Sequence, residues 1–512
     1  MSYYLGLDVG TSGTKALVMD AQGKVLATAT SPHTLSSPKP GWSEQDPDEW
    51  YSATVKASRA ALQKAAIDAR QVVGIGLSGQ MHGLVITDGS GRSLRPSIIW
   101  NDQRTADQAR QIEETVGGRD RLIQLVGNAA MTSFTLTKLL WVRQNEPALY
   151  DRIQHLLLPK DYVRLRLTGE YVGEVSDMSG TLLLDQETRD WSKAMVSRFE
   201  IDRDILPPVI ESDKISGNLT RKAADELGLR EGVPVVGGGG DQPAGAIGNG
   251  IVREGLTSAT IGTSGVVYVH SSRYRVDPDS RVNTFCSCVS GQWCLFGCVL
   301  SAGGSLRWLR DTVGRDFVRR AQEQGVDPYY LMTEAAASAA PGCDGVFFLP
   351  YLTGERTPHA DPNARGAWIG LTTRTTADDL VRAVLEGVTF AMADVVSILR
   401  ERGIDIEQIR LSGGGARSPF WRQLQADIYG SACCTVNSDE GAAYGVALLA
   451  AVGTGRFANI QEACESAVAV TDTVKPDQAR MKRYQALHGQ YQRLYPALKT
   501  EFSNISGMFA GG

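Results

Sequence analysis

The sequence predicts an α/β protein whose two halves share one design. The tetrapeptide Gly-Thr-Ser-Gly occurs at Gly10–Gly13 and again at Gly262–Gly265, close to half of the 512 residues apart. Each copy lies between two short apolar segments, which is the pattern of a strand, a polar turn and a second strand. The repeat therefore predicts a duplicated domain whose two turns face each other and cradle the phosphates of a nucleotide.

Hydrophobic periodicity and turn residues predict the elements around the two hairpins. A helix is expected from Pro47 to about Ala66, with Asp46 as its N-cap and Glu49 closing a capping box. In the second half we expect strands within 257–269 and at 292–300 and 409–412, and helices at 302–313, 376–402, from Ser418 onward and at 476–498. Strands of the first half are expected at Tyr3–Val9, Lys15–Asp20, Lys24–Thr30, Val72–Leu77, Leu84–Thr87, Lys214–Asn218 and Val233–Val236.

Composition and charge exclude several classes of partner. The net charge is −5 and no basic stripe occurs, so nucleic acid and anionic membranes are poor candidates. No apolar run reaches the length of a membrane span, and the chain leads from Met1 directly into a predicted strand. We therefore expect a cytoplasmic protein. Its oligomeric state stays open, a homodimer included. The eight cysteines form no C-x-x-C motif and are expected to be reduced thiols packed as small apolar residues.

Asp8 is the first candidate for a functional residue. It ends an apolar strand two residues before the first Gly-Thr-Ser-Gly. A carboxylate there can hold Mg²⁺ or its waters while backbone N–H groups of the turn point at phosphate oxygens. The alternative is an ordinary aspartate at a junction of strand and turn. The second copy of the turn favours the functional interpretation.

Asp241 is the second candidate, because it follows four consecutive glycines at Gly237–Gly240. Such a run costs backbone entropy that a plain turn does not require, so the backbone is expected to approach another group closely. If Asp241 faces the same site as Asp8, its carboxylate can accept the proton of an attacking hydroxyl. Phosphoryl transfer to an alcohol needs such a base. The alternative, compatible with this role, is an N-cap for the following helix.

Other motifs are less specific. Gly413–Gly415 could lie against an adenine ring or a ribose, or form a generic turn. His82 could donate a hydrogen bond to a polyol or be a structural histidine. Trp100–Asp102 suits a sugar or a helix start. Gly74–Gly79 matches G-x-G-x-x-G, but the chain continues into a strand, so we reject a dinucleotide site.

Several long motifs, in order along nearly the whole chain, resemble the FGGY carbohydrate kinases. Asp8–Gly13 resembles the family's first phosphate hairpin. Ser133–Asn145 resembles the first family signature, and segments within Gly366–Gly387 resemble the second. Three further segments resemble the branch of the family that acts on xylulose, namely Trp42–Pro47, Gln80–Gly83 and Leu349–Pro358.

This resemblance implies the actin-like ATPase fold, an α/β class in which two ribonuclease H-like domains enclose an interdomain catalytic cleft. The implied sugar-binding domain is 1–247, the implied ATP-binding domain is 248–512, and the C-terminal helix is implied to pack on the body. The implied reaction transfers the γ-phosphate of ATP to the 5-hydroxyl of D-xylulose, with Mg²⁺ as cofactor. The implied partners are thus a small-molecule sugar and ATP.

The resemblance also implies roles for individual residues. Asp241 is the implied proton acceptor, Asp8 the implied partner of metal and phosphate, and both are implied metal ligands. Gln242 and Ser418 depart from the family pattern, since asparagine occurs at both positions among relatives. Implied sugar contacts are Met81, His82, Asp241 and Gln242, and implied nucleotide contacts are Thr11, Ser12, Thr263, Gly303, Trp308, Gly414, Gly415 and Ser418.

Two alternatives remain at the level of sequence. The first is a kinase of the same family for another ketopentose, a polyol or glycerol, because the motifs define the reaction better than the substrate. The second is an ATP-driven switch of the actin or chaperone type, which shares the hairpin clamp. Asp241 and Gln80–His82 favour the kinase, because a switch needs no groups that face a sugar.

Overall fold

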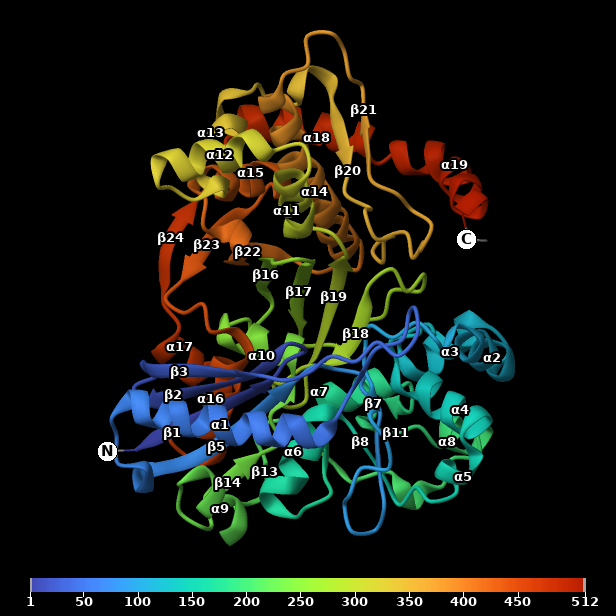
Figure 1. Cartoon of the computed structure of the whole chain (residues 1–512), viewed down its shortest axis with the longest axis vertical. Coiled ribbons are helices and arrows are strands. Elements are labelled where there is room, and N and C mark those ends of the chain that lie inside the picture. Colours follow the sequence, from blue (N-terminus) through green and yellow to red (C-terminus); the bar gives the residue numbers. More distant parts are fainter. Residues whose placement is uncertain (1, 510–512) are drawn as a thin grey trace. The chain divides into compact units, whose positions relative to one another are not determined.

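The computed structural model describes residues 2–509, which form two compact units (Figure 1). Unit 1 comprises the chain up to Arg253 together with His270–Cys294 and Glu440–Ala469. Unit 2 comprises Glu254–Val269, Leu295–Asp439 and the chain from Val470 onward. These units differ from the expected division into 1–247 and 248–512, because part of the second half of the chain folds with the first half.

The helix α16 (Gly441–Gly453) explains this difference, since it packs on strands of the sheet in unit 1. A methyl group on Gly6 would overlap the carbonyl of Ala443, and one on Gly76 would overlap the carbonyl of Val446. Helix backbone and strand backbone are therefore in direct contact. The sequence shows these glycines but not their partners, so it could not assign α16 to unit 1.

The main sheet of unit 1 begins with the expected meander of three strands. β1 pairs antiparallel with β2, β2 pairs antiparallel with β3, and β5 lies parallel to β1 on the other side. The order is β13-β14-β5-β1-β2-β3, and β15 also pairs with β5. The strands are β1 (Tyr3–Val9), β2 (Gly13–Asp20), β3 (Val25–Pro32), β5 (Val72–Gly79), β13 (Ile215–Asn218), β14 (Pro234–Val236) and β15 (Gly239–Gly240).

The two faces of this sheet are covered by different helices. Leu5 and Leu7 of β1 share a buried apolar cluster with Trp50 and Ala57 of α1 (Pro47–Ala65). Gly6 lies between those two leucines and contacts α16. Because successive side chains of a strand point to opposite faces, α1 and α16 cover opposite faces of the sheet.

The start of α1 agrees with the sequence in part. Asp46 is the N-cap and accepts from the N–H of Asp48 at 2.9 Å, and Pro47 is the first helical residue. The expected capping box with Glu49 is wrong. The Glu49 carboxylate accepts instead from the N–H of Thr34 at 2.8 Å, a residue on the segment that leads away from β3. A tertiary contact therefore replaces the local one.

The main sheet of unit 2 repeats the design. Its order is β18-β19-β17-β16-β22-β23-β24, and it contains an antiparallel hairpin, β16–β17, followed by parallel pairing of β16 with β22. β18 and the adjoining ends of β17 and β19 belong to unit 1. The strands are β16 (Gly255–Ile261), β17 (Gly265–Ser271), β18 (Asn283–Cys286), β19 (Trp293–Val299), β22 (Ile406–Gly413), β23 (Ala432–Val436) and β24 (Val470–Val474).

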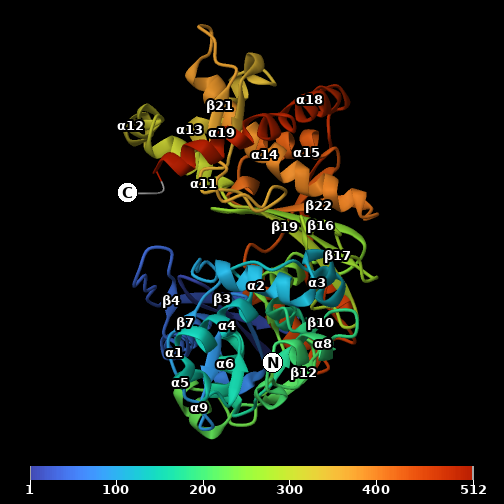
Figure 2. The same cartoon turned by 90° about the vertical axis from the view of Figure 1, so that its right-hand side faces the viewer.

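The long helix α14 (Ala377–Glu401) packs on this second sheet, and Figure 2 shows α14 and α15 (Pro419–Tyr429) on the same side of its strands. A Cβ on Gly297 would lie 2.6 Å from Val395, and one on Gly265 would overlap the sulfur of Met392. Thr376 and Asp379 form a capping box at the start of α14. The two sheets share a hairpin followed by a parallel strand, so the predicted duplication is confirmed.

The remaining elements surround these sheets. The expected tail helix at 476–498 consists of two helices, α18 and α19. The other helices are α2 (Ala106–Val116), α3 (Arg119–Val126), α4 (Thr135–Asn145), α5 (Pro147–Tyr150), α6 (Pro159–Thr168), α7 (Val175–Met178), α8 (Lys193–Arg198), α9 (Arg221–Leu227), α10 (Asp241–Gly248), α11 (Gly303–Asp311), α12 (Arg315–Gln324), α13 (Pro328–Ser338), α17 (Ile460–Ala467), α18 (Gln478–Tyr491) and α19 (Leu494–Phe509). Short strand pairs are β4 (Glu44–Gln45) with β7 (Ser97–Ile98), β6 (Val85–Thr87) with β8 (His155–Leu157), β9 (Gly173–Glu174) with β12 (Val209–Ile210), β10 (Leu184–Asp185) with β11 (Asp190–Trp191), and β20 (Phe347–Leu349) with β21 (Ala367–Ile369).

Two expectations from composition can be compared with the structure. All eight cysteines are free thiols, and all except the partly exposed Cys298 are buried. The expectation of reduced, packed thiols is thus confirmed. Among residues 2–509, the structure contains no helix with the length and apolar character that crossing a membrane requires.

Candidate active site

The first hairpin, Gln80–His82 and Asp241 meet at one edge of the sheet in unit 1. β1 and β5 pair in parallel up to Val9 and Gly79, and Gly240 pairs with Gly79 from the other side. The chain leaves these three strands in the same direction, toward Gly10, Gln80 and Asp241. Ligands of α/β sheets bind at the carboxyl ends of the strands. This edge is therefore the candidate active site of unit 1.

Asp241 is the first residue of α10, and Gly240 occupies the N-cap position. The interpretation of Asp241 as an N-cap is therefore wrong. Burial and, to a smaller extent, the negative charge of Asp8 raise the pKa of Asp241 to about 7, although hydrogen bonds from Gln242 oppose the shift. A carboxyl group with this pKa is well suited to accept a proton near neutral pH.

Asp8 lies on β1 opposite Ser78 of β5 and opposite Lys15 of β2. Burial raises the pKa of Asp8, and the Ser78 hydroxyl and the charge of Lys15 oppose this rise only in part. The Oδ1 atom of Asp8 is buried without a hydrogen bond of good geometry. Two neighbouring carboxylates with an unsatisfied buried oxygen suit a divalent cation, which would offset their repulsion.

The sequence predicts that the backbone of the four glycines before Asp241 approaches another group closely. In the structure, that group is other backbone and side-chain atoms of this protein. Gly238 has a φ of +72°, and a methyl group there would overlap the carbonyl of Leu77. A side chain on Gly239 would overlap the sulfur of Cys288, and a Cβ on Gly240 would lie 2.8 Å from Met81. The run therefore lets the backbone lie directly against β5 and its neighbours.

Side chains from three other segments hold the first hairpin. Thr11 Oγ1 donates to Gln80 Oε1 at 3.3 Å and accepts from Trp100 Nε1 at 3.0 Å. The Thr11 carbonyl accepts from Gln45 Nε2 at 2.7 Å. The Ser12 side chain is exposed. Gln45 and Trp100 have no spacing that would reveal this role, so the sequence could not assign it.

Met81 and His82 lie in the segment between β5 and β6. Met81 is buried against Gly240, next to Asp241. His82 has a φ of +71°, and its Nδ1 lies 3.2 Å from the carbonyl of Gly180. Because a carbonyl only accepts, Nδ1 carries the proton in this contact.

The backbone of His82 is anchored by the first family signature. Its carbonyl accepts from Lys138 Nζ and from Thr135 Oγ1, both at 3.1 Å. The Lys138 side chain is completely buried on α4. The rings of Phe134 and Phe285 contact the imidazole at centroid distances of 5.0 and 5.8 Å. The signature thus positions the segment that carries His82.

Trp100–Asp102 does not begin a helix, because α2 starts at Ala106 with Thr105 as its N-cap, and a sugar contact by this segment stays untested. The indole of Trp100 binds the first hairpin, as described above. The buried carboxylate of Asp102 accepts from the N–H of Ser43 at 2.6 Å and forms an ion pair with Arg104 at 2.7 Å. Asp102 is therefore a structural residue.

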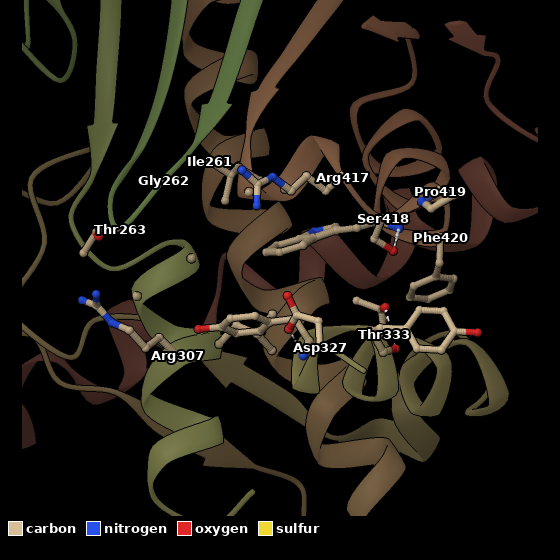
Figure 3. A pocket seen from close by; sticks show the side chains of 18 of the residues that line it. Ile261, Gly262, Thr263, Arg307, Asp327, Thr333, Arg417, Ser418, Pro419 and Phe420 are labelled. Atoms are coloured by element: carbon tan, nitrogen blue, oxygen red, sulfur yellow. Dashed lines mark hydrogen bonds between the residues drawn. The ribbon is translucent and has the colours of Figure 1, made fainter. Parts of the chain in front are cut away.

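Unit 2 contains a cavity of about 520 Å³ at the corresponding edge of its own sheet. Ile261 at the end of β16 pairs with Gly413 at the end of β22, so the second hairpin and Gly414 leave the sheet side by side. In Figure 3, Thr263 and Arg307 lie at one end of this cavity, and Ser418 and Phe420 lie at the other. The lining residues are Ile261, Gly262, Thr263, Gly303, Gly304, Leu306, Arg307, Asp327, Tyr329, Tyr330, Thr333, Glu334, Gly414, Gly415, Arg417, Ser418, Pro419, Phe420 and Trp421.

Five of the expected nucleotide contacts line this cavity, namely Thr263, Gly303, Gly414, Gly415 and Ser418. The start of α11 is tied to the hairpin, because the N–H of Gly303 donates to the carbonyl of Gly262 at 2.9 Å. Ser418 is also the N-cap of α15 and accepts from the N–H of Trp421. The expected helix start at Ser418 is thus confirmed.

Trp308 does not line the cavity. Its ring packs on Phe348 and Trp368 at centroid distances of 6.3 and 5.4 Å. Conversely, sequence analysis did not identify Tyr329, Tyr330 or Phe420, which do line it. In a sequence, aromatic residues on helices look like core residues. The segment around Tyr329 and Tyr330 also contains no motif that indicates a binding site.

The chain belongs to the FGGY family of carbohydrate kinases. It matches the N-terminal domain of that family over residues 3–248 and the C-terminal domain over residues 257–454. It is therefore an ATP-dependent sugar kinase with the two-domain, actin-like fold that the sequence predicts. Within residues 2–509, no group of three or more histidine, cysteine, aspartate or glutamate side chains is placed to hold a metal ion.

Its similarity to named members of the family extends over nearly the whole chain. It is 39% identical to the xylulose kinase of Escherichia coli (strain K12) over 496 residues, which are 97% of this chain and 99% of the relative. A ligand-bound xylulose kinase from Lactobacillus acidophilus has a TM-score of 0.92 at 26% identity, covering 99% of this chain and 100% of the other. A gluconate kinase from the same organism has a TM-score of 0.91 at the same identity and coverage.

The raised pKa of Asp241 predicts the pH dependence of the enzyme. If Asp241 accepts the proton of the attacking hydroxyl, its protonation below about pH 7 makes kcat/KM fall about tenfold per pH unit on the acidic side. Asp8→Asn removes a negative charge that raises the pKa of Asp241, so the acidic limb of its residual activity moves to lower pH. Steady-state rates over about pH 5 to 9 test this. An unchanged limb in Asp8→Asn would contradict the proposed coupling.

Gly414→Ala tests the cavity of unit 2. A Cβ at Gly414 meets no atom closer than 3.7 Å, so the fold accepts it, whereas the methyl group reduces the space for a nucleotide. We expect KM for ATP to rise about tenfold, with an unchanged melting temperature and an unchanged KM for the sugar. Unaltered ATP affinity in the variant would mean that the nucleotide binds elsewhere.

Proposed function

We propose that this kinase transfers the γ-phosphate of ATP to the 5-hydroxyl of D-xylulose, forming D-xylulose 5-phosphate and ADP. The observation that carries the chemistry is the pair Asp8 and Asp241 at the edge of the sheet, with the pKa of Asp241 raised to about 7. The similarity to xylulose kinases over nearly the whole chain supports the choice of sugar.

Asp241 acts as the general base in this proposal. Its carboxylate accepts the proton of the sugar hydroxyl as the oxygen attacks the γ-phosphorus. Met81, His82 and Gln242 are proposed to contact the sugar, with His82 forming a hydrogen bond to a second hydroxyl. These contacts hold the attacking oxygen near the base, which is the positioning that phosphoryl transfer requires.

Asp8 and Asp241 would hold Mg²⁺, directly or through its waters. The fit rests on the unsatisfied Oδ1 of Asp8 and on the repulsion between the two carboxylates. Mg²⁺ prefers few protein carboxylates and keeps several waters, so the site needs no larger acidic cluster. When bound, the ion offsets negative charge on the phosphate oxygens.

ATP is proposed to bind in the cavity of unit 2, with its phosphates toward Thr263 and Arg307 and its adenine toward Phe420. The backbone of the second hairpin and the Arg307 guanidinium suit phosphates. Aromatic rings and the bare backbone of Gly414 and Gly415 suit a flat base. The first hairpin, including Thr11 and Ser12, is proposed to meet the transferred phosphate.

A cytoplasmic location is also proposed. The reaction consumes ATP, and eight free cysteines suit a reducing compartment.

A kinase of the same family for another ketopentose, a polyol or glycerol is the second candidate. It rests on the fact that a gluconate kinase has almost the same TM-score as a xylulose kinase. A coupled assay that detects ADP, run over ketopentoses, pentitols, gluconate and glycerol, decides between them. The proposal requires the highest kcat/KM for D-xylulose. A higher value for any other acceptor would replace the substrate and leave the chemistry intact.

Asp241→Ala tests the proposed base. Without a proton acceptor, kcat is expected to fall about 10²- to 10⁴-fold. KM for ATP should change less than about threefold, because the cavity lined by Gly414 lies in the other unit. Near-normal turnover in the variant would refute the assignment.

His82→Ala tests the proposed sugar contact. Loss of one hydrogen bond and of the ring's packing is expected to raise KM for D-xylulose about tenfold or more. KM for ATP should stay within about twofold of the original value. Parallel increases in both constants would indicate a general disturbance of the fold instead.

A further inference from the structure

A buried cluster of charged side chains lies behind Gly237–Gly240, and the chemistry proposed above does not use it. Lys160 Nζ lies 2.7 Å from Asp161, 3.4 Å from Asp177 and 3.7 Å from Glu174. All four side chains are completely inaccessible to solvent. Replacing such a cluster with apolar residues often costs no stability, so its presence suggests a role in fixing one conformation.

Glu174 connects this cluster to Ser176 through hydrogen bonds. One oxygen of its carboxylate accepts from the N–H of Ser176 at 2.8 Å and from Ser212 Oγ at 2.6 Å. The other accepts from Ser176 Oγ at 2.8 Å and from the N–H of Asp177 at 3.2 Å. Both oxygens are therefore engaged, and the Ser176 side chain has a defined orientation.

Ser176 in turn holds the backbone next to Asp241. A hydroxyl group has one proton, and that of Ser176 is donated to Glu174, so the oxygen can accept. It accepts from the N–H of Gly240 at 3.2 Å. At the other end of the glycine run, Arg164 Nη1 donates to the carbonyl of Gly237 at 2.9 Å. Arg164 also pairs with Asp161, at 2.5 Å.

The glycine run needs such support. Glycine has the largest backbone freedom of any residue, and four in a row connect Asp241 to β14. A displacement of a catalytic group by about 1 Å can cost a factor of about 10² in rate. Close packing on Leu77 and Met81 limits the run from one side. The hydrogen bond from Gly240 to Ser176 adds a restraint at the residue directly before Asp241.

We propose that Ser176 is a positioning residue, which orients the base Asp241 by holding the N–H of Gly240 on the buried Lys160–Glu174 cluster. The proposal rests on the proposed role of Asp241. Ser176 acts on the rate through Asp241 and contacts neither sugar nor nucleotide.

Ser176→Ala is the test, and Ser179→Ala is a matched control. Ser179 is also buried and follows α7 directly. Its hydroxyl likewise accepts from one backbone N–H, that of Cys286 at 3.0 Å, and donates once, to the carbonyl of Val175 at 2.7 Å. Both variants therefore lose one buried hydroxyl and leave one N–H unpaired. Of these two serines, only Ser176 contacts Gly237–Gly240.

We expect Ser176→Ala to lower kcat about tenfold to hundredfold, with KM for both substrates within about twofold. Ser179→Ala should keep kcat within about twofold and lose less thermal stability, because Ser176 donates to a buried carboxylate and Ser179 donates to a neutral carbonyl. Equal kcat values in the two variants would overturn the proposal. So would a loss of kcat in Ser176→Ala that is accompanied by equal increases in both KM values.

The double variant Ser176→Ala, Asp241→Ala separates positioning from a general effect. If Ser176 acts only through Asp241, the double variant turns over as slowly as Asp241→Ala alone. A further loss of about tenfold would overturn the positioning role. Near-normal turnover in Asp241→Ala would overturn the proposed base itself. A large loss in Asp241→Ala with none in Ser176→Ala would overturn only this inference.

Discussion

The electrostatic repulsion between Asp8 and Asp241 is the interaction on which the catalytic half of this protein depends. Two partly buried carboxyl groups at one sheet edge cannot both be charged without cost, and burial together with this repulsion raises the pKa of Asp241 to about 7. The same repulsion makes the edge attractive to a divalent cation. One arrangement thus supports both parts of the proposed mechanism, a base that works near neutrality and a place for metal-bound phosphate.

The repulsion exists only because the backbone brings the two residues together. Asp8 and Ser78 are neighbours across parallel strands, and Gly239 pairs with Ser78 from the other side. Helix α10 then begins at Asp241. Glycines make this possible at several levels, from Gly6 and Gly76 under α16 to Gly238 against Leu77. Glycines at these positions therefore allow the backbones of strands and helices to pack in direct contact.

Unit 2 has a corresponding sheet edge, but different residues surround it. The pairing of Ile261 with Gly413 corresponds to that of Val9 with Gly79, yet Thr260 rather than a carboxylate stands at the position that corresponds to Asp8. The edge instead opens into a cavity lined by glycines and aromatic residues. The duplicated design thus supplies two hairpins, and the residues around them differ in the way that the proposed roles require, with carboxylates at the first hairpin and a cavity at the second.

The sequence by itself determined the duplicated hairpins, the strands on either side of them, the cap Asp46, the helix start at Ser418, and the family, because these are local patterns or long ordered motifs. It also pointed to Asp8 and Asp241 through their positions after an apolar strand and a glycine run. Only the tertiary structure decided the membership of α16 in unit 1, the contact of Glu49 with Thr34, the location of Trp308 away from the cavity, and the support of Gly240 by Ser176. Each of these depends on contacts between residues far apart in the chain, and neither periodicity nor spacing records which distant residue becomes the partner.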